Sequence, residues 1–300
     1  VAPSVSAQTQ QSGLTVETRY ASHESLSGGF HGSHWGALPL FLLHSTSGTY
    51  HAMHRRRADS LYAFFVVHQP PGAPARKILE LVDSFSISGY GIGEGATTYE
   101  GDLVVPLRFA IRRGLRRADG TWLVPPDNSP LKGMRDDAFL FIRIQPNGNI
   151  VWSRELRSES GQGFLSLYHN YGNPPSITQQ DGKLLLMFRT FRNKIVYGGD
   201  SLMGTPHPQG FRHMYHSVYW MMHVDPGTGV FLRRENLYAR RYQTLDEYDH
   251  HQSIASDDDG NVYFSLYWPG NALFQGQREL LSEPGVKEHY FLLKVDPDLN

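Results

Sequence analysis

The chain has 300 residues, of which 40% are hydrophobic, 28 are Lys or Arg and 29 are Asp or Glu. This composition is that of a folded globular protein, and a formal net charge of -1 excludes the global basic field with which many proteins bind nucleic acids. The chain has no cysteine and no run of about eighteen apolar residues, which excludes disulfides, thiolate metal sites and an apolar membrane-spanning helix.

The chain begins with the small and polar sequence VAPSVSAQTQQSG, residues 1–13. Such a stretch is typical of the mature end that remains after a signal peptide has been removed, although an ordinary frayed terminus has the same composition. The missing cysteines also fit an exported bacterial protein. We therefore expect the protein to be secreted or periplasmic.

A repeat organises the rest of the chain. Four β-type apolar runs lead into a Pro/Gly turn: YAFFVVHQPPG, AFLFIRIQPNG, VYWMMHVDPGTG and YFLLKVDPDLN. Their prolines, Pro70, Pro146, Pro226 and Pro297, are 76, 80 and 71 residues apart. After the first three turns comes another short strand, in ARKILEL, NIVWSREL and VFLRREN. Each pair of runs therefore predicts a β-hairpin.

A second hairpin precedes each of these, with its turn at STSG, YEG, QQDG or DDDG. Seven residues after the turn glycine come, in order, Arg55, Arg108, Arg189 and Tyr267. Two hairpins per repeat, with a long loop between them, predict an all-β fold, a β-propeller of four-stranded antiparallel blades. We treat residues 1–300 as one domain with repeats at approximately 25–85, 86–160, 161–240 and 241–300. We expect a segment of a larger ring, the alternative being a four-bladed ring closed by the N-terminal strand.

The strand directions predict which residues share a face. In such a blade the second strand returns to the face where the first one starts, so residues 166–194 (SLYHNYGNPPSITQQDGKLLLMFRTFRNK) bring His169 and Arg189 to the same face. The other expected members of this face are His31, His34, Arg108, Arg112, Arg113, Tyr248, His250, His251, Tyr267 and Trp268. Because few carboxylates enter this set, we expect an anionic substrate.

Each of these residues also has a purely structural interpretation. A lone histidine before a strand is more often a packing or capping residue, and Arg189 fits a tie between blades equally well. The sequence RRGLRR, residues 112–117, is typical of a solvated basic loop, and residues 257–259 (DDD) are typical of a turn, because they lack the spacing of a calcium loop. No Gly-x-Ser-x-Gly, P-loop or His-Glu-x-x-His motif is present.

Residues 169–189, HNYGNPPSITQQDGKLLLMFR, resemble the blade signature of secreted bacterial BNR-type β-propellers, the group that includes ulvan-type polysaccharide lyases. The shared features are a His-Asn start, a proline before the first strand, a glycine turn and an arginine closing the second strand. The tyrosine that these lyases place just before the proline falls at Asn173 here, and Tyr171 is its nearest substitute. The turns DPGTG and QPNGNIVW also resemble those of aryl-sulfotransferase-like and quinoprotein-like propellers.

The resemblance implies a polysaccharide lyase that cleaves a uronate-containing polysaccharide, sulfated or not, by β-elimination. This reaction needs a cation that neutralises the carboxylate, a base and an acid. Arg189 is the expected cation, His169 or His251 the base, and Tyr171 or Tyr248 the acid. The expected substrate-binding residues are Arg192, Arg108, Asn173, Tyr267, Trp268 and His34. No cofactor is required, and a structural calcium or zinc ion is left open.

Two other functions fit the same residues. A sulfotransferase-like propeller would carry the sulfate on one histidine and hold it with Arg189. A non-catalytic propeller would bind an acidic glycan on the same face. In each case we expect an acidic polysaccharide or sulfated ligand as the partner, no nucleic acid, no membrane span and a monomer.

Overall fold

The protein is all-β. The computed structural model describes residues 14–15, 38–56, 62–83, 95–127, 137–158, 175–190, 194–203, 216–241, 251–268, 270–275, 278–282 and 289–300. In these ranges the chain forms strands and turns and no helix. It follows that the described part of the chain offers no apolar helix of membrane-spanning length.

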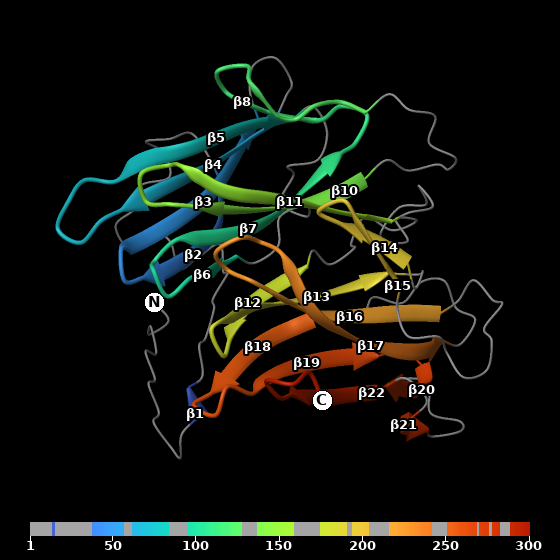
Figure 1. Cartoon of the computed structure of the whole chain (residues 1–300). Coiled ribbons are helices and arrows are strands. Elements are labelled where there is room, and N and C mark those ends of the chain that lie inside the picture. Colours follow the sequence, from blue (N-terminus) through green and yellow to red (C-terminus); the bar gives the residue numbers. More distant parts are fainter. Residues whose placement is uncertain are drawn as a thin grey trace.

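The strands form four antiparallel sheets that follow one another along the chain (Figure 1). The first sheet has the order β2 (Leu38–Ser45), β3 (Gly48–Arg56), β4 (Tyr62–Gln69), β5 (Arg76–Asp83), β8 (Leu115–Arg117), β9 (Trp122–Val124). The second sheet has the order β6 (Ala96–Thr97), β7 (Leu103–Ala110), β10 (Asp137–Ile144), β11 (Ile150–Ser158), β14 (Lys194–Tyr197), β15 (Asp200–Met203).

The third and fourth sheets continue this arrangement. The third sheet has the order β12 (Ser176–Gln180), β13 (Lys183–Thr190), β16 (His216–Val224), β17 (Phe231–Arg241), β20 (Gly270–Gln275), β21 (Arg278–Ser282). The fourth sheet has the order β1 (Leu14–Thr15), β18 (His251–Asp257), β19 (Val262–Trp268), β22 (His289–Val295). The short β1 thus lies beside β18.

Three sheets have six strands where the sequence predicted four. The inner four come from one repeat in chain order, as predicted, and the outer two form a hairpin from the following repeat. These hairpins, β8–β9, β14–β15 and β20–β21, lie in segments that the sequence predicted to be loops. In the first three repeats the fourth strand would otherwise leave backbone groups unpaired at its edge, and the hairpin pairs with them.

The turns are found at the predicted glycines and prolines. Gly48, Gly101, Gly182 and Gly260 stand at the turns that connect the first two strands of each repeat, and each has a positive φ. In the third repeat Asp181 and Gly182 both have positive φ, of 46° and 72°, which is the conformation of a two-residue type I′ turn. Pro70, Pro146, Pro226 and Pro297 all lie in the turn that follows the third strand of their repeat.

The core consists of apolar layers between successive sheets. In β7 the alternate residues Leu103, Val105, Leu107 and Phe109 belong to the layer shared with the first sheet, whereas Val104 belongs to the layer shared with the third sheet. The same alternation divides β13 between the second and fourth sheets. Strands β7, β10, β13 and β16 are therefore buried on both faces, which explains why they read as nearly continuous apolar runs.

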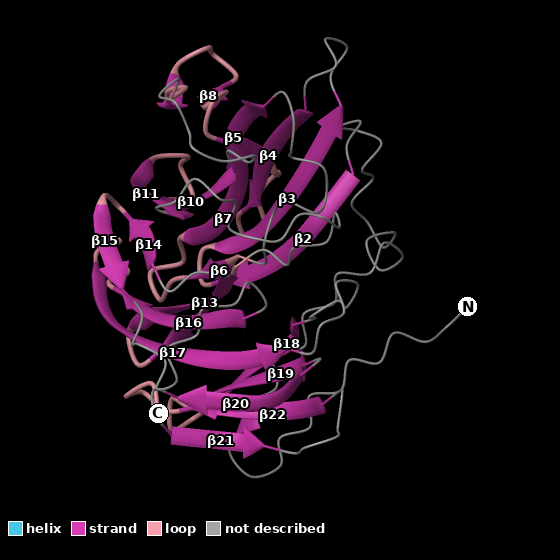
Figure 2. Cartoon of the chain, turned by 90° about the vertical axis from the view of Figure 1, so that its right-hand side faces the viewer, coloured by secondary structure: helices cyan, strands magenta, loops and turns pink. Residues whose placement is uncertain are grey.

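The sheets share a common orientation. At the first–second strand turns, Ser47 Oγ donates to the Gly101 carbonyl at 2.7 Å and Gln180 Nε2 donates to the Gly260 carbonyl at 2.9 Å. Gln179 Nε2 likewise donates to the Thr97 carbonyl, so these turns lie on one side of the molecule. We call this side the turn end and the opposite side the loop end. Figure 2 shows that the set of sheets curls like half of a barrel.

Candidate functional site

Three predicted site residues occupy equivalent positions at the loop end. Each lies near the end of the second strand of its repeat and pairs with the residue seven positions before the turn proline. The pairs are Arg108 with Phe139, Arg189 with Tyr219, and Tyr267 with Tyr290. The third and fourth sheets pack directly against each other, so the backbones of Arg189 and Tyr267 lie in neighbouring layers, which are typically about 10 Å apart.

Two further predicted residues lie at the same end of the fourth sheet. His251 begins β18 and pairs with Leu266, and Trp268 ends β19. The side chain of Arg108 is half-buried on β7. Arg112 and Arg113 are exposed in the turn that follows β7. The other predicted residues lie outside the described residues: His31, His34, His169, Tyr171, Asn173, Arg192, Tyr248 and His250. The roles assigned to all of these residues stay predictions.

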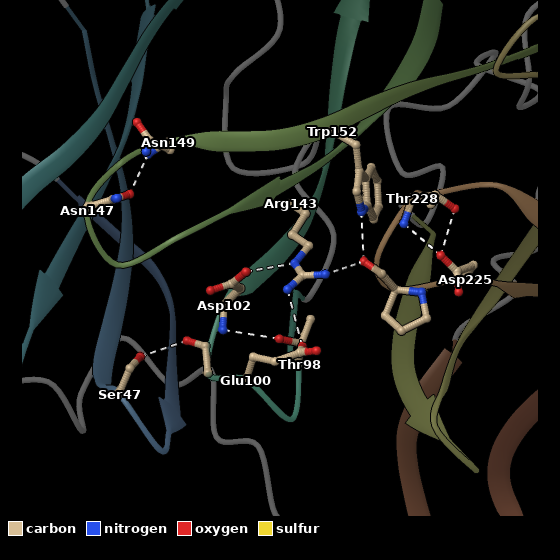
Figure 3. A network of polar contacts seen from close by, with 12 residues as sticks. Ser47, Thr98, Glu100, Asp102, Arg143, Asn147, Asn149, Trp152, Asp225 and Thr228 are labelled. Atoms are coloured by element: carbon tan, nitrogen blue, oxygen red, sulfur yellow. Dashed lines mark hydrogen bonds and ion pairs between the residues drawn. The ribbon is translucent and has the colours of Figure 1, made fainter.

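The best-defined polar cluster lies at the turn end (Figure 3), around Arg143 of β10. This arginine is 7% exposed. Its Nε donates to Asp102 Oδ2 at 2.7 Å, its Nη2 to Glu100 Oε2 at 3.2 Å, and its Nη1 to the Pro226 carbonyl at 2.6 Å. Because Arg143 thereby bonds both to its own repeat and to the turn of the next one, it ties the second sheet to the third.

The turn that accepts this bond is held by several other side chains of the second sheet. Trp152 Nε1 donates to the Pro226 carbonyl at 2.8 Å, and Tyr197 OH donates to the Gly229 carbonyl at 3.1 Å. Within the turn, Asp225 Oδ1 accepts bonds from the backbone N and the Oγ1 of Thr228, both at 2.7 Å. The hydrogen bond from the Thr228 hydroxyl is the main reason why the pKa of Asp225 is lowered. These bonds fix the turn against the second sheet.

A corresponding series of hydrogen bonds connects the third sheet to the fourth. His223 Nε2 lies 2.7 Å from Gln180 Oε1, and Gln180 Nε2 donates to the carbonyls of Gly260 and Val295. The Gln180 oxygen can only accept, so His223 carries its proton on Nε2. Burial, together with the positive charges of Lys183 and Arg233, lowers the pKa of His223 to about 4. The histidine is therefore neutral at pH 7 and acts as a hydrogen-bond donor.

The described residues contain no group of three or more His, Asp or Glu side chains arranged to hold a metal ion. The acidic sequence at residues 257–259 forms the β18–β19 turn, as predicted. Asp257 Oδ1 accepts from the backbone N of Asn261 at 2.8 Å, and Asp257 Oδ2 accepts from Tyr263 OH at 2.9 Å. The carboxylate of Asp257 is thus used to close its own turn.

Sequence reasoning did not single out the turn-end residues Arg143, Gln180 and His223. A signal was present, because Arg143 and His223 each stand three positions before the turn proline, inside an otherwise apolar strand. A polar residue at a position that is buried on both sides needs partners, and the adjacent turn supplies them.

Comparisons with known proteins give no further guide, since no family model, no curated protein and no solved structure matches the chain.

Proposed function

We propose that the chain is a segment of a β-propeller whose blades carry a hairpin added by the next repeat. Three features support this architecture. Each sheet follows the chain order of its own repeat, the turn glycines and prolines are equivalent in all four repeats, and an apolar layer separates each sheet from the next. Successive sheets with an apolar layer between them are what the radial packing of blades requires.

We propose further that the loop end binds an acidic polysaccharide and cleaves it by β-elimination. The observation that carries the proposal is the recurrence of Arg108, Arg189 and Tyr267 at one repeat position, at the end where β18 begins with His251. At the turn end, polar side chains form hydrogen bonds and ion pairs that connect the sheets. The loop end is therefore the end that we propose for a ligand. Long connections at one end of a rigid scaffold are where binding residues usually lie.

In the proposed reaction, each residue of the loop end has its own chemical role. The guanidinium of Arg189 neutralises the uronate carboxylate, which makes the neighbouring C5–H more acidic. A base, His169 or His251, removes this proton, and the electron pair forms the C4–C5 double bond as the C4–O bond breaks. An acid, Tyr171 or Tyr248, protonates the departing oxygen. The products are an unsaturated uronate end and a new hydroxyl end.

The test is a panel of polysaccharides incubated with the protein. Polygalacturonate, alginate and sulfated uronate polymers should be included, with neutral dextran as the control. An increase in the ultraviolet absorbance of an unsaturated uronate supports the lyase. Transfer from an aryl-sulfate donor without such absorbance would favour a sulfotransferase, and binding without either product would favour a non-catalytic glycan-binding protein.

A further inference from the structure

The connection after β7 carries an unusual concentration of positive charge. Residues 108–124 contain five arginines and one aspartate, whereas the whole chain has a net charge of -1. Arg112, Arg113 and Arg116 are exposed. Trp122, on the neighbouring strand, is 49% exposed, which is high for so large an apolar side chain. Exposed cations beside an exposed aromatic ring are a typical surface for an anionic ligand.

This segment is fixed to the core. Ile111 and Leu115 are 7% and 1% exposed and belong to the apolar layer between the first and second sheets. β8 pairs with the fourth strand of the first sheet, where Val82 is opposite Arg116. Gly114 has a φ of 63° and lies so close to the Val124 carbonyl that any side chain would collide with it. The arginines are therefore held by ordered backbone, and the sequence RRGLRR is more than a solvated loop.

Arg116 and Trp122 are paired in the β8–β9 hairpin, next to a shift of register between Leu115 and Arg116. Partners in an antiparallel pair project from the same face with their Cβ atoms about 5 Å apart. An arginine and an indole at this separation present a bidentate donor for a carboxylate or sulfate next to a flat apolar surface for a sugar ring. The spacing thus suits one acidic sugar unit.

The acidic side chains around the hairpin already have other contacts. Asp119 Oδ1 accepts from the backbone N and Oγ1 of Thr121 at 2.9 and 2.7 Å. Glu80 contacts Lys77, and Asp127 lies 4.0 Å from Arg157. Asp119 also interacts electrostatically with Arg117 of the hairpin. With five arginines to one aspartate in residues 108–124, the segment keeps a net positive charge.

We propose that Arg116 and Trp122 form a secondary binding surface for the polysaccharide, at the outer edge of the first sheet and separate from the candidate site. Arg112 and Arg113 lie just after β7 and, in sequence, between Arg108, near the end of that strand, and the β8–β9 hairpin, so they connect this surface to the loop end. A polysaccharide that extends beyond the candidate site would lie along these arginines. The class of ligand rests on the proposed function, whereas the surface is defined by its own residues.

The experiment measures binding of dextran sulfate and polygalacturonate by affinity electrophoresis, with neutral dextran as the negative control. The test variant combines Arg116→Gln with Trp122→Ala. The matched control combines Lys294→Gln with Leu292→Ala, which removes an exposed cation and a 66% exposed apolar side chain from the fourth sheet. The test variant should bind the two polyanions about tenfold more weakly than the wild type, and the control should bind like the wild type.

Three results would overturn the proposal: wild-type protein that ignores both polyanions, equal losses in the two variants, or tighter binding of duplex DNA than of either polysaccharide. The measurement needs no turnover and is therefore independent of the lyase assay. If no unsaturated product forms but the test variant alone loses affinity, the catalytic proposal fails and the binding surface stands.

Discussion

Replacing Arg143 by methionine should destabilise the protein by about 3–5 kcal/mol, because it leaves a buried carboxylate without its cation. The three contacts of Arg143 contribute differently to this loss of stability. The side chain of Glu100 is 65% exposed, so its ion pair is worth less than about 1 kcal/mol. The Pro226 carbonyl keeps its bond from Trp152. The loss therefore comes mainly from Asp102, which is 3% exposed and, within the described residues, pairs with no other cation.

Urea unfolding followed by tryptophan fluorescence measures this loss. Arg157→Met is the matched control, since its two ion pairs are 3.8 and 4.0 Å long and its side chain is 39% exposed; it should cost less than about 1 kcal/mol. Adding Asp102→Leu to Arg143→Met removes the stranded charge and should restore part of the stability. A loss below about 1 kcal/mol for Arg143→Met alone would refute the assignment of Arg143 as a buried tie between sheets.

Three further predictions concern the other turn-end contacts. Gln180→Leu should cost about 2–4 kcal/mol in the same unfolding assay, because it removes the hydrogen-bond partner of two buried groups, His223 and the Val295 carbonyl, and of the partly buried Gly260 carbonyl. The low pKa of His223 means that the folded protein takes up this proton near pH 4 and the unfolded chain near pH 6.5. The free energy of unfolding should thus fall by up to about 3 kcal/mol between pH 7 and pH 4, and this slope should be shallower in His223→Gln. Gly229→Ala should be more destabilising than Gly72→Ala by about 1–3 kcal/mol: their φ angles are 69° and 68°, but only at Gly229 would the new Cβ meet the Trp152 ring, at 2.6 Å. Equal losses in the two glycine variants would contradict the close packing of this turn.

Much of the fold could be predicted because its signals are local. An Asp-Gly pair between two apolar runs specifies a tight hairpin, and the four prolines mark equivalent turns because proline has no N–H to donate to a sheet. The added hairpins could not be predicted in the same way. The strands LRR and WLV are too short to form a sheet alone and depend on the free edge of β5, which is distant in sequence.

The candidate site was less predictable than the fold. Strand direction indicated that Arg108, Arg189 and Tyr267 would share one end, since this follows from the repeat alone. The partners of Arg143 could not be inferred, because its bond to the Pro226 carbonyl joins residues 83 positions apart and depends on how two sheets pack. The histidines and tyrosines assigned as base and acid lie in or beside connections whose paths are not set by strand alternation, and their roles stay predictions.

The most direct test of the proposed function compares Arg189→Ala with Lys183→Ala, which alters a cation at the turn end of the same strand, β13. The measurement is the initial rate at which unsaturated uronate forms from the best acidic polysaccharide of the panel, with both variants shown to be folded by their unfolding curves. Loss of one electrostatic contact to the developing charge should slow Arg189→Ala by about 10²- to 10³-fold, while Lys183→Ala keeps the wild-type rate. A folded Arg189→Ala variant with near wild-type turnover would contradict the proposed reaction and leave Arg189 as a structural tie.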